Sequence, residues 1–386
     1  MKFEFATATR IVFGAGALKE ISALAREFGQ HALVVTGRDA RRAEPLLELL
    51  EAAEGILSAT TSPISGEPTL DGVSRDARVA KVAGCDFVIG FGGGSAIDAG
   101  KAVAAMMTNE GELLDYVEVI GRGKPLAQPP APFVAIPTTA GTGAEVTRNA
   151  VLLSPEHRVK VSLRSPLMLP RLALVDPELT YDLPPALTAS TGLDALTQLI
   201  EPYVSCRANP MTDALCVEGI RRAARSLRLA FADGHNKAAR ADMALASLFS
   251  GMALANAGLG AVHGFAAPIG GMFPAPHGAV CAALLPHVMA ANLRALRTRA
   301  PAGEALRRYD EVARLLTGRL TATADDGVKC VGELVAELGI SKLSSYGIGE
   351  RHVGELVEKA SKTSSMKGNP VALTDEEMAD ALRAAV

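Results

Sequence analysis

The sequence predicts an α/β domain with a parallel sheet, followed by an all-α domain. In the first half, short apolar runs alternate with helical patterns, which is typical of a parallel sheet covered by helices. From about residue 185 the strand signals nearly vanish, and long patterns rich in alanine and leucine follow. The break at Leu183-Pro184-Pro185 marks this change. We therefore expect two domains, residues 1–184 and 185–386.

Three strands are expected in the first domain. His31–Thr36 is rich in β-branched residues, and the helix Arg41–Ala52 follows it. Asp86–Phe91 is the second strand and precedes the helix Ala96–Met106. Pro132–Ile136 is the third strand. Because parallel strands need long crossover connections, we expect helices on both faces of this sheet.

The second domain is expected to consist of long helices. The clearest helical patterns are Pro210–Leu227 and Lys237–Ala257. At roughly 100–200 residues per domain, a chain of 386 residues is long enough for two. Hydrophobic residues make up 48% of the chain and charged residues 21%, so both domains can bury a core and long disorder is not expected.

Charge and targeting signals narrow the classes of partner. The net charge of −3 provides no basic excess for a nucleic acid or a membrane surface, so neither is an expected partner. The five cysteines are scattered and include no CxxC pair, which is typical of a reduced, intracellular protein. Neither a signal peptide nor an apolar run of about 20 residues is present, and we expect a cytoplasmic protein.

The strongest local signal in the first half is a glycine-rich loop at residues 88–98, VIGFGGGSAID. A buried strand runs into three glycines and then a helix, so the backbone and the helix N-terminus can approach a pyrophosphate. Ser95 and Asp98 have the spacing of an N-cap pair. The loop departs from GxGxxG because position 95 is serine. The alternative is a tight turn with a capped helix and no ligand.

A second polar loop, PTTAGTGAEVT at residues 137–147, follows the third strand. Its threonine hydroxyls and glycine backbone suit the phosphate or amide groups of a nucleotide, although a threonine-rich turn is the alternative. Ligands of parallel sheets bind at the carboxyl ends of the strands, where both loops lie. Together the loops predict a dinucleotide-binding domain.

The second half contains a candidate metal site. Asp194 and Gln198 share one helix face, and Glu201 is within reach of it. His263 and His277 come later in the chain. An acidic residue with two histidines is a credible set of ligands for a divalent metal that keeps one position open to substrate. The alternative is that the histidines are satisfied core residues and Asp194 is a helix-surface charge.

These motifs, in this order, resemble the iron-containing (group III) alcohol dehydrogenase family over nearly the whole chain. The matching segments are TRIVFGAGAL at 9–18, GGGSAID at 92–98, PTTAGTGAEVT at 137–147, LALVDPELT at 172–180, TGLDAL at 191–196, NAGLGAVHG at 256–264 and PHGAVCAALLPH at 276–287.

The resemblance implies a dehydroquinate synthase-like fold with a dinucleotide-binding domain and a helical metal-binding domain. It implies NAD(P)-dependent interconversion of an alcohol and an aldehyde or ketone, with iron or zinc as a Lewis acid, in a homodimer or higher homo-oligomer. The implied cofactor-binding residues are Gly37, Gly92, Gly93, Gly94, Ser95, Asp98, Thr138, Thr139, Thr142, Asn149 and Lys160. The implied metal ligands are Asp194, Gln198, His263 and His277, of which Asp194, His263 and His277 are also the predicted catalytic residues.

The loop after the first strand bears on the choice of cofactor. An acidic residue directly after the strand binds the ribose 2′-hydroxyl of NAD and repels the 2′-phosphate of NADP. Gly37 occupies that place here, and Arg38, Arg41 and Arg42 lie nearby. These residues favour NADP slightly over NAD. The alternative is that the arginines form a solvated helix start and Asp39 serves NAD.

Two departures from the family pattern keep other functions open. Position 198 is usually histidine, whereas Gln198 offers a weaker, neutral oxygen ligand. Many members have a further histidine at the position of Ala267. The alternatives are a metal-independent maleylacetate reductase-type enzyme, a lyase of the dehydroquinate synthase kind and a catalytically silent nucleotide-binding protein. The presence of Asp194, His263 and His277 favours the metal-dependent dehydrogenase.

Overall fold

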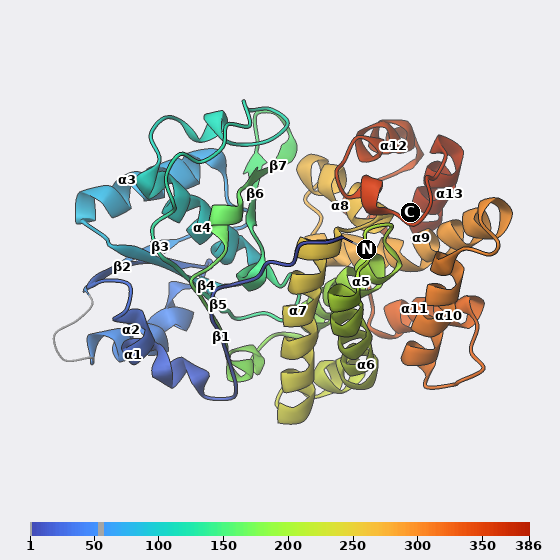
Figure 1. Cartoon of the computed structure of the whole chain (residues 1–386), viewed down its shortest axis with the longest axis horizontal. Helices are drawn as coiled ribbons and strands as arrows, with labels where there is room; N and C mark the ends of the chain where they lie inside the picture. Colours follow the sequence, from blue (N-terminus) through green and yellow to red (C-terminus); the bar gives the residue numbers. More distant parts are fainter. Residues whose placement is uncertain (1, 53–57) are drawn as a thin grey trace. The chain divides into compact units, whose positions relative to one another are not determined.

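The computed structural model describes residues 2–52 and 58–386 (Figure 1). The chain forms two compact units. An α/β unit contains Thr7–Thr139 and Ala144–Thr180. A helical unit contains Tyr181–Val386, the N-terminal segment up to Ala6, and the short segment Ala140–Gly143. The main division therefore falls between Thr180 and Tyr181.

The centre of the α/β unit is a parallel sheet with the strand order β1-β8-β5-β4-β2-β3. An antiparallel hairpin of two further strands completes the unit. The sheet strands are β1 (Ile11–Phe13), β2 (His31–Thr36), β3 (Ser58–Pro63), β4 (Phe87–Gly92), β5 (Phe133–Pro137) and β8 (Leu172–Val175), and the hairpin strands are β6 (Asn149–Ser154) and β7 (Val159–Arg164). The predicted strand His31–Thr36 is confirmed residue for residue.

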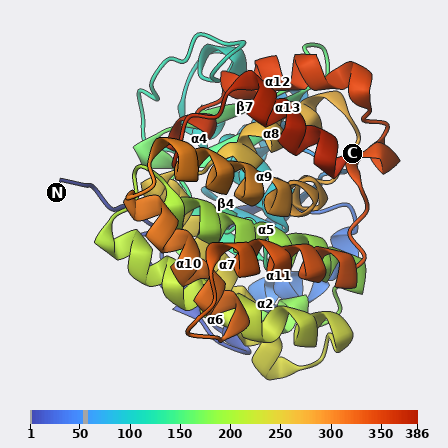
Figure 2. The same ribbon diagram turned by 90° about the vertical axis from the view of Figure 1, so that its right-hand side faces the viewer.

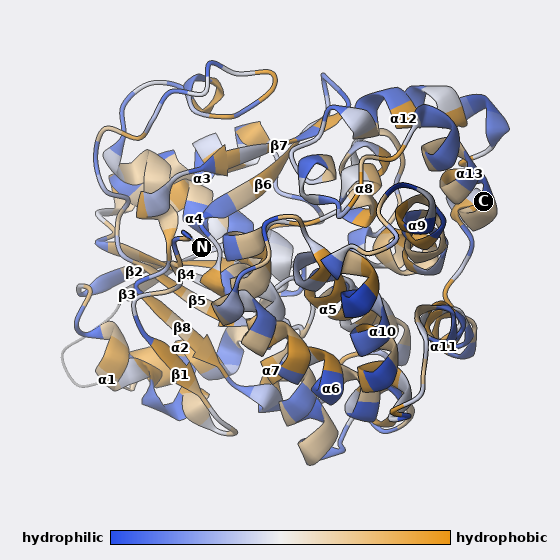
Figure 3. Cartoon of the chain, turned by 45° about the vertical axis from the view of Figure 1, so that its right-hand side comes forward, coloured by the Kyte–Doolittle hydropathy of each residue, from blue (hydrophilic) through white to orange (hydrophobic). Residues whose placement is uncertain are grey.

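Helices cover both faces of this sheet, as predicted. They are α1 (Ile21–Ala25), α2 (Glu44–Glu51), α3 (Leu70–Ala83) and α4 (Gly94–Thr108). Alternate residues of β2 point to opposite faces, so Leu33 and Val35 pack in the cluster of α3 and α4, whereas Ala32 and Val34 pack in the cluster of α1 and α2. The apolar residues of β5 and β8 are visible in Figure 3 as orange strands.

The helix predicted at Arg41–Ala52 starts later in the structure. Residues Ala40–Ala43 form a 3-10 turn, and the α-helix α2 begins only at Glu44. Pro45 explains the position of this start, because proline has no N–H and is tolerated in the first turn of a helix but not in its interior.

The helical unit contains nine α-helices among the described residues (Figure 2). They are α5 (Pro185–Val204), α6 (Pro210–Ala232), α7 (Lys237–Ala257), α8 (Ala261–Met272), α9 (His277–Arg299), α10 (Glu304–Thr317), α11 (Ala324–Glu337), α12 (Val353–Ser361) and α13 (Asp375–Ala385). The predicted helix Lys237–Ala257 is confirmed at both ends. Helix α9 is the centre of the unit and packs against α5, α8, α11 and α13.

Within the described residues, α9 is also long and apolar enough to cross a membrane, judged by length and composition. The helices α7 and α8 pass the same test as a pair, but the chain bends by 99° between them. In α9, 83% of the most apolar window is buried inside the protein. Its place at the core of the helical unit therefore accounts for its apolar composition.

Two close contacts explain why Ala140–Gly143 belongs to the helical unit. A Cβ at Gly143 would lie 2.5 Å from backbone atoms of Gly251 in α7, and Gly143 has φ +59°. A Cβ at Gly141 would lie 2.8 Å from the side chain of Thr191. Only glycine permits backbone contacts this close, so the two glycines of the second polar loop are packing residues of the helical unit.

Candidate active site

The glycine-rich loop lies at the carboxyl ends of the central strands of the α/β unit. Strand β4 ends at Gly92, Gly93 is the N-cap, and α4 begins at Gly94. The amide of Thr138 donates to the carbonyl of Gly92 at 2.9 Å, which joins this loop to the loop after β5. A Cβ at Gly93 would lie 3.4 Å from the side chain of Thr139. The N-terminus of α4, whose first N–H groups have no partner within the helix, thus lies beside the side chain of Thr139, as an anion site requires.

The predicted N-cap pair of Ser95 and Asp98 is wrong. The cap of α4 is Gly93, and its capping uses no side chain. The carboxylate of Asp98 instead accepts a hydrogen bond from the amide of Val151 at 3.0 Å and pairs with Lys101 at 3.3 Å. Asp98 therefore ties α4 to the start of the hairpin, because helix capping needs a side chain one residue before the first turn.

Lys101 is a buried cation beneath this loop. Its ammonium donates to the carbonyl of Asn149 at 2.6 Å and to the hydroxyl of Thr147 at 2.8 Å. Burial lowers the pKa of Lys101, whereas Asp98 and Glu145 oppose that shift. Burial also raises the pKa of Glu145 to about 7. The predicted cofactor residue Asn149 thus belongs to a buried polar network under α4.

Two predicted cofactor residues make no contact with this network that the structure shows. The ammonium of Lys160, on β7, pairs with Glu67 at 2.8 Å. Thr142 belongs to the helical unit. The rest of the predicted set lies around the start of α4 and the adjacent strand ends: Gly37, Gly92, Gly93, Gly94, Ser95, Asp98, Thr138, Thr139 and Asn149.

The loop after β2 reaches the same edge of the sheet. A Cβ at Gly92 would lie 3.4 Å from the amide nitrogen of Gly37. Two residues further on, Asp39 accepts from the guanidinium of Arg41 at 2.9 and 3.1 Å. This hydrogen bond with Arg41 lowers the pKa of Asp39. Arg38 and Arg42 flank the pair on the exposed surface.

In the helical unit, three helices bring four metal-binding side chains together. Asp194 comes from α5, His263 from α8, and His277 and Cys281 from α9. One donor atom of each lies within 4.8 Å of all the others. The carboxylate oxygen Oδ1 of Asp194 is 3.4 Å from Nε2 of His263 and 3.7 Å from Nε2 of His277. Cys281 was not among the predicted ligands, although its spacing of four residues from His277 places both side chains on one helix face.

The site is buried on one side and partly open on the other. The side chains of Asp194 and His263 are 2% and 6% exposed, whereas His277 is 32% exposed. A Cβ at Gly278 would lie 2.5 Å from the carbonyl oxygen of Ser190. Glycine therefore lets the start of α9 approach α5 closely, which places His277 beside Asp194.

Glu201 orients one of the histidines. Its Oε2 lies 2.6 Å from Nδ1 of His263, and its Oε1 accepts from the amide of Val262 at 2.7 Å. A carboxylate that binds one ring nitrogen of a histidine leaves the lone pair of the other nitrogen for a metal. The geometry therefore presents Nε2 of His263 to Asp194.

In the metal-free cluster, positive charge on the histidines stabilises the carboxylate of Asp194. Burial alone would raise the pKa of Asp194, but His277 and His263 outweigh it and lower that pKa to about 2. Burial also opposes a positive charge on His263, but Cys281, Glu201 and Asp194 raise its pKa well above the ordinary value. Burial raises the pKa of the Cys281 thiol to about 12.

Buried oxygen atoms that make no hydrogen bond indicate whether a metal fits the cluster. Among the described residues, Oδ1 of Asp194 and Oε1 of Gln198 are buried without a hydrogen-bond partner. Leaving a buried acceptor unpaired costs about 1–3 kcal/mol, and more for a charged group. A cation between Asp194, His263 and His277 would bind the first of these oxygens, so the residues present fit a divalent metal.

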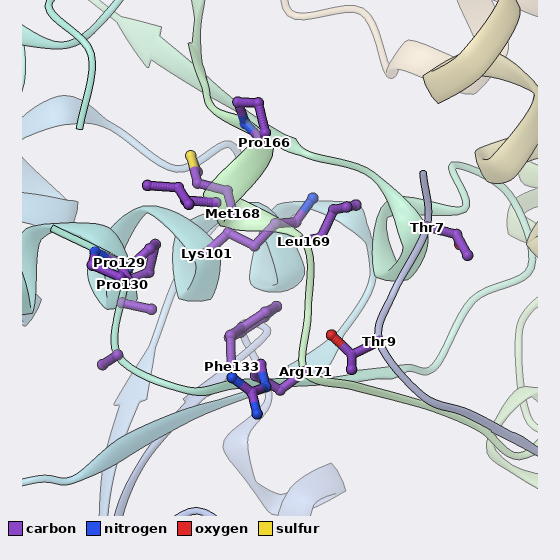
Figure 4. Close-up of a pocket in the computed structure, with 13 residues that line it drawn as sticks. Thr7, Thr9, Lys101, Pro129, Pro130, Phe133, Pro166, Met168, Leu169 and Arg171 are labelled. Carbon is purple, nitrogen blue, oxygen red and sulfur yellow. The ribbon is translucent and has the colours of Figure 1, made fainter. Parts of the chain in front are cut away.

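A cavity of about 270 Å³ lies elsewhere in the α/β unit (Figure 4). Its walls include Lys101, Phe133, Met168, Leu169 and Arg171. Among the described residues that line it, none belongs to the glycine-rich loop. The cavity therefore does not mark the predicted pyrophosphate site.

Comparison with known proteins decides the family. The model described as "Iron-containing alcohol dehydrogenase" matches residues 8–177, and the one described as "Fe-containing alcohol dehydrogenase family, C-terminal" matches residues 188–386. The chain belongs to the iron-containing alcohol dehydrogenase family.

Individual relatives agree with this assignment. The chain is 36% identical over 368 residues to 1,3-propanediol dehydrogenase of Klebsiella pneumoniae, covering 92% of each protein. A crystal structure of 1,3-propanediol oxidoreductase is similar over 100% of both chains, with a TM-score of 0.92 and 34% identity. Sulfoacetaldehyde reductase from Bifidobacterium kashiwanohense, in complex with NAD+, has a TM-score of 0.87 and 29% identity, covering 100% of this chain and 99% of that chain.

Family membership confirms the predicted class of activity. As an iron-containing alcohol dehydrogenase, the protein is an oxidoreductase that interconverts alcohols and aldehydes with NAD and a metal. The parallel-sheet domain followed by a helical domain is also confirmed.

Proposed function

We propose that alcohol oxidation and carbonyl reduction take place beside the cluster of Asp194, His263 and His277, with Gln198 next to it. The observation that carries this proposal is the unpartnered Oδ1 of Asp194, which lies 3.4 and 3.7 Å from the two imidazole Nε2 atoms. A buried acceptor among imidazole nitrogens is the arrangement that a divalent cation stabilises.

Each residue has a distinct role in the proposed site. When bound, the metal supplies Lewis-acid polarisation of the substrate oxygen, and the nicotinamide accepts or gives the hydride. Asp194 provides the charged ligand, and Glu201 fixes the ring of His263. His277 lies on the exposed side, where substrate enters. Gln198 either binds through its amide oxygen or leaves that place to another donor.

We further propose that the loop at 92–98 and the threonines after β5 bind the cofactor's pyrophosphate. The support is the helix N-terminus at Gly94 and the adjacent side chain of Thr139. The NADP preference expected from the sequence depends on Arg38 and Arg42, since Arg41 already pairs with Asp39. A paired carboxylate repels a 2′-phosphate less than an isolated one does.

For the substrate, we propose a small alcohol or diol and its aldehyde or ketone. The support is the likeness to 1,3-propanediol dehydrogenase over 92% of both proteins. We also propose a cytoplasmic homodimer or higher homo-oligomer. The support for the location is the pattern of five free, scattered cysteines.

The test is a substrate panel under defined metal loading. The protein is stripped with a chelator, reloaded separately with iron, zinc or manganese, and assayed with short alcohols, diols and aldehydes and with both cofactors. We expect chelation to abolish turnover and one of the metals to restore it. Full activity after chelation, with no metal found by elemental analysis, would instead favour a metal-independent reductase of the maleylacetate reductase type.

A further inference from the structure

The thiol of Cys281 lies in the metal cluster and has no role in the function described above. Its sulfur is 3.7 Å from Nε2 of His263 and 3.7 Å from Nε2 of His277, and the residue is fully buried. We propose that Cys281 binds the metal as a thiolate and completes a four-donor set with Asp194, His263 and His277.

The distances between the donor atoms match a tetrahedral zinc-type site. With metal bonds of about 2.3 Å to sulfur and about 2.0–2.1 Å to nitrogen and oxygen, tetrahedral angles place sulfur and nitrogen about 3.6 Å apart, and nitrogen and oxygen about 3.4 Å apart. The sulfur–nitrogen distances here are 3.7 Å, and the nitrogen–oxygen distances are 3.4 and 3.7 Å. Four of the six distances between the donor atoms thus agree with a single shared ion, and all four atoms lie within 4.8 Å of one another.

A second observation points to a ligand at the same place. The side chain of Asp194 is 2% exposed, and its Oδ1 has no hydrogen-bond partner among the described residues. That oxygen is one of the four atoms that lie within 4.8 Å of one another. The cysteine thus lies close to a buried carboxylate oxygen that makes no hydrogen bond among the described residues, and a shared cation would bind both groups.

Local structure explains why this cysteine reaches the site. Helix α9 begins at His277, so Cys281 follows one turn later on the same face. The close approach of Gly278 to the backbone of Ser190 holds this turn against α5. The two donors from α9 are therefore positioned together by one helix–helix contact.

The thiolate has a chemical consequence for metal choice. A charged, soft sulfur binds zinc or cobalt more strongly than the neutral amide oxygen of Gln198 does, and it disfavours manganese and magnesium. On binding, the S–H bond breaks, a sulfur–metal bond forms, and one proton passes to solvent. The inference rests on the proposed function only in requiring that a metal binds.

Cobalt spectroscopy tests the proposal independently of turnover. The stripped full-length protein is loaded with Co²⁺ alone, and the near-ultraviolet spectrum is recorded for the thiolate-to-cobalt charge-transfer band. We expect the band in wild type and in Cys206→Ser, whose cysteine is exposed. We expect it to disappear in Cys281→Ser and Cys281→Ala, with zinc affinity reduced by roughly tenfold or more and manganese affinity reduced less.

The outcomes separate this inference from the proposed function. Bound cobalt in wild type without the band, or a band that persists in Cys281→Ser, overturns the role of Cys281 and leaves the metal function standing. Failure of wild type to bind any divalent metal overturns both. Absence of the band from cobalt-loaded wild type overturns the role of Cys281 even where one variant does not fold, and either of the two Cys281 variants suffices to assign a band that is present.

Discussion

Nδ1 of His263 lies 2.6 Å from Oε2 of Glu201, and this contact leaves Nε2 of His263 facing Asp194. The first prediction concerns this pair. In Glu201→Gln the charged acceptor is lost, so the imidazole is held less firmly and is a weaker base. We expect metal affinity to fall by roughly tenfold to a hundredfold, measured by competition with a fluorescent chelator. Unchanged affinity in a folded variant would show that Glu201 has only a packing role.

The second prediction concerns His277. Replacing it by alanine leaves Asp194 and His263 with too few donors to hold a catalytic metal, so we expect loss of both bound metal and turnover. Elemental analysis after loading and a carbonyl-reduction assay measure the two effects. His287→Ala is the matched control because it removes a histidine from the same helix outside the cluster. Equal losses in both variants would count against the assignment.

The third prediction concerns the glycine-rich loop. In Gly93→Val, Cβ lies 3.4 Å from Thr139 and the two methyl groups enter the space above the N-terminus of α4. We expect cofactor affinity to fall by roughly tenfold or more, about 1.4 kcal/mol, measured by fluorescence titration with NADH and NADPH. Gly354→Ala, where a Cβ would meet open space, should bind the cofactor normally. Normal binding by a folded Gly93→Val protein would remove the loop from the cofactor site.

The fourth prediction concerns cofactor choice. Asp39→Asn keeps an oxygen for the amide of Arg41 but removes the negative charge and frees the guanidinium. We expect the ratio of kcat/KM with NADPH to that with NADH to rise several-fold, because a 2′-phosphate meets more positive charge. Glu51→Gln removes an exposed acid at the other end of α2 and should leave the ratio unchanged. If this kcat/KM ratio falls in Asp39→Asn, Asp39 does not disfavour NADPH as predicted.

The fifth prediction concerns pH and stability. Burial raises the pKa of Glu145 from 4.5 to about 7, so the folded protein keeps a proton that the unfolded chain releases. Stability from this group is therefore greatest below pH 4.5 and declines as the pH rises to 7. We expect Glu145→Gln to be more stable than wild type at pH 8.5, by about 3 kcal/mol at most, and similar near pH 4.5. Melting curves of the cofactor-free proteins, with Glu20→Gln as a surface control, measure this.

Strongly patterned elements could be predicted from the sequence, and weakly patterned ones could not. His31–Thr36 and Lys237–Ala257 were predicted at both ends because each carries a consistent apolar or helical pattern. Strand β3 has the sequence SATTSP, whose polar residues resemble a loop, and β1 has only three residues. Their pairing with neighbouring strands, rather than local propensity, makes them strands.

In the candidate site, too, some residues could be predicted from the sequence and others could not. Asp194, His263 and His277 could be proposed from residue type and spacing, and the structure brings them together. Cys281 was missed because a lone cysteine in an apolar stretch is usually a core residue. Only the start of α9 at His277 shows that the side chain of Cys281 lies on the same helix face as His277. Asp98 was assigned to a cap because spacing alone does not show that β6 offers it an amide.

The donor atoms of the metal cluster come from three helices, of which α5 is far from α8 and α9 in the chain. A bound ion would therefore act as a reversible cross-link that holds α5, α8 and α9 to one another. Such a cross-link strengthens with the free concentration of the ion, by about 2.7 kcal/mol when that concentration is a hundred times the Kd. During synthesis, Asp194 leaves the ribosome well before His277, so the ion can be captured only after α9 has emerged. Resistance of the helical unit to unfolding would thus report the supply of metal in the surroundings.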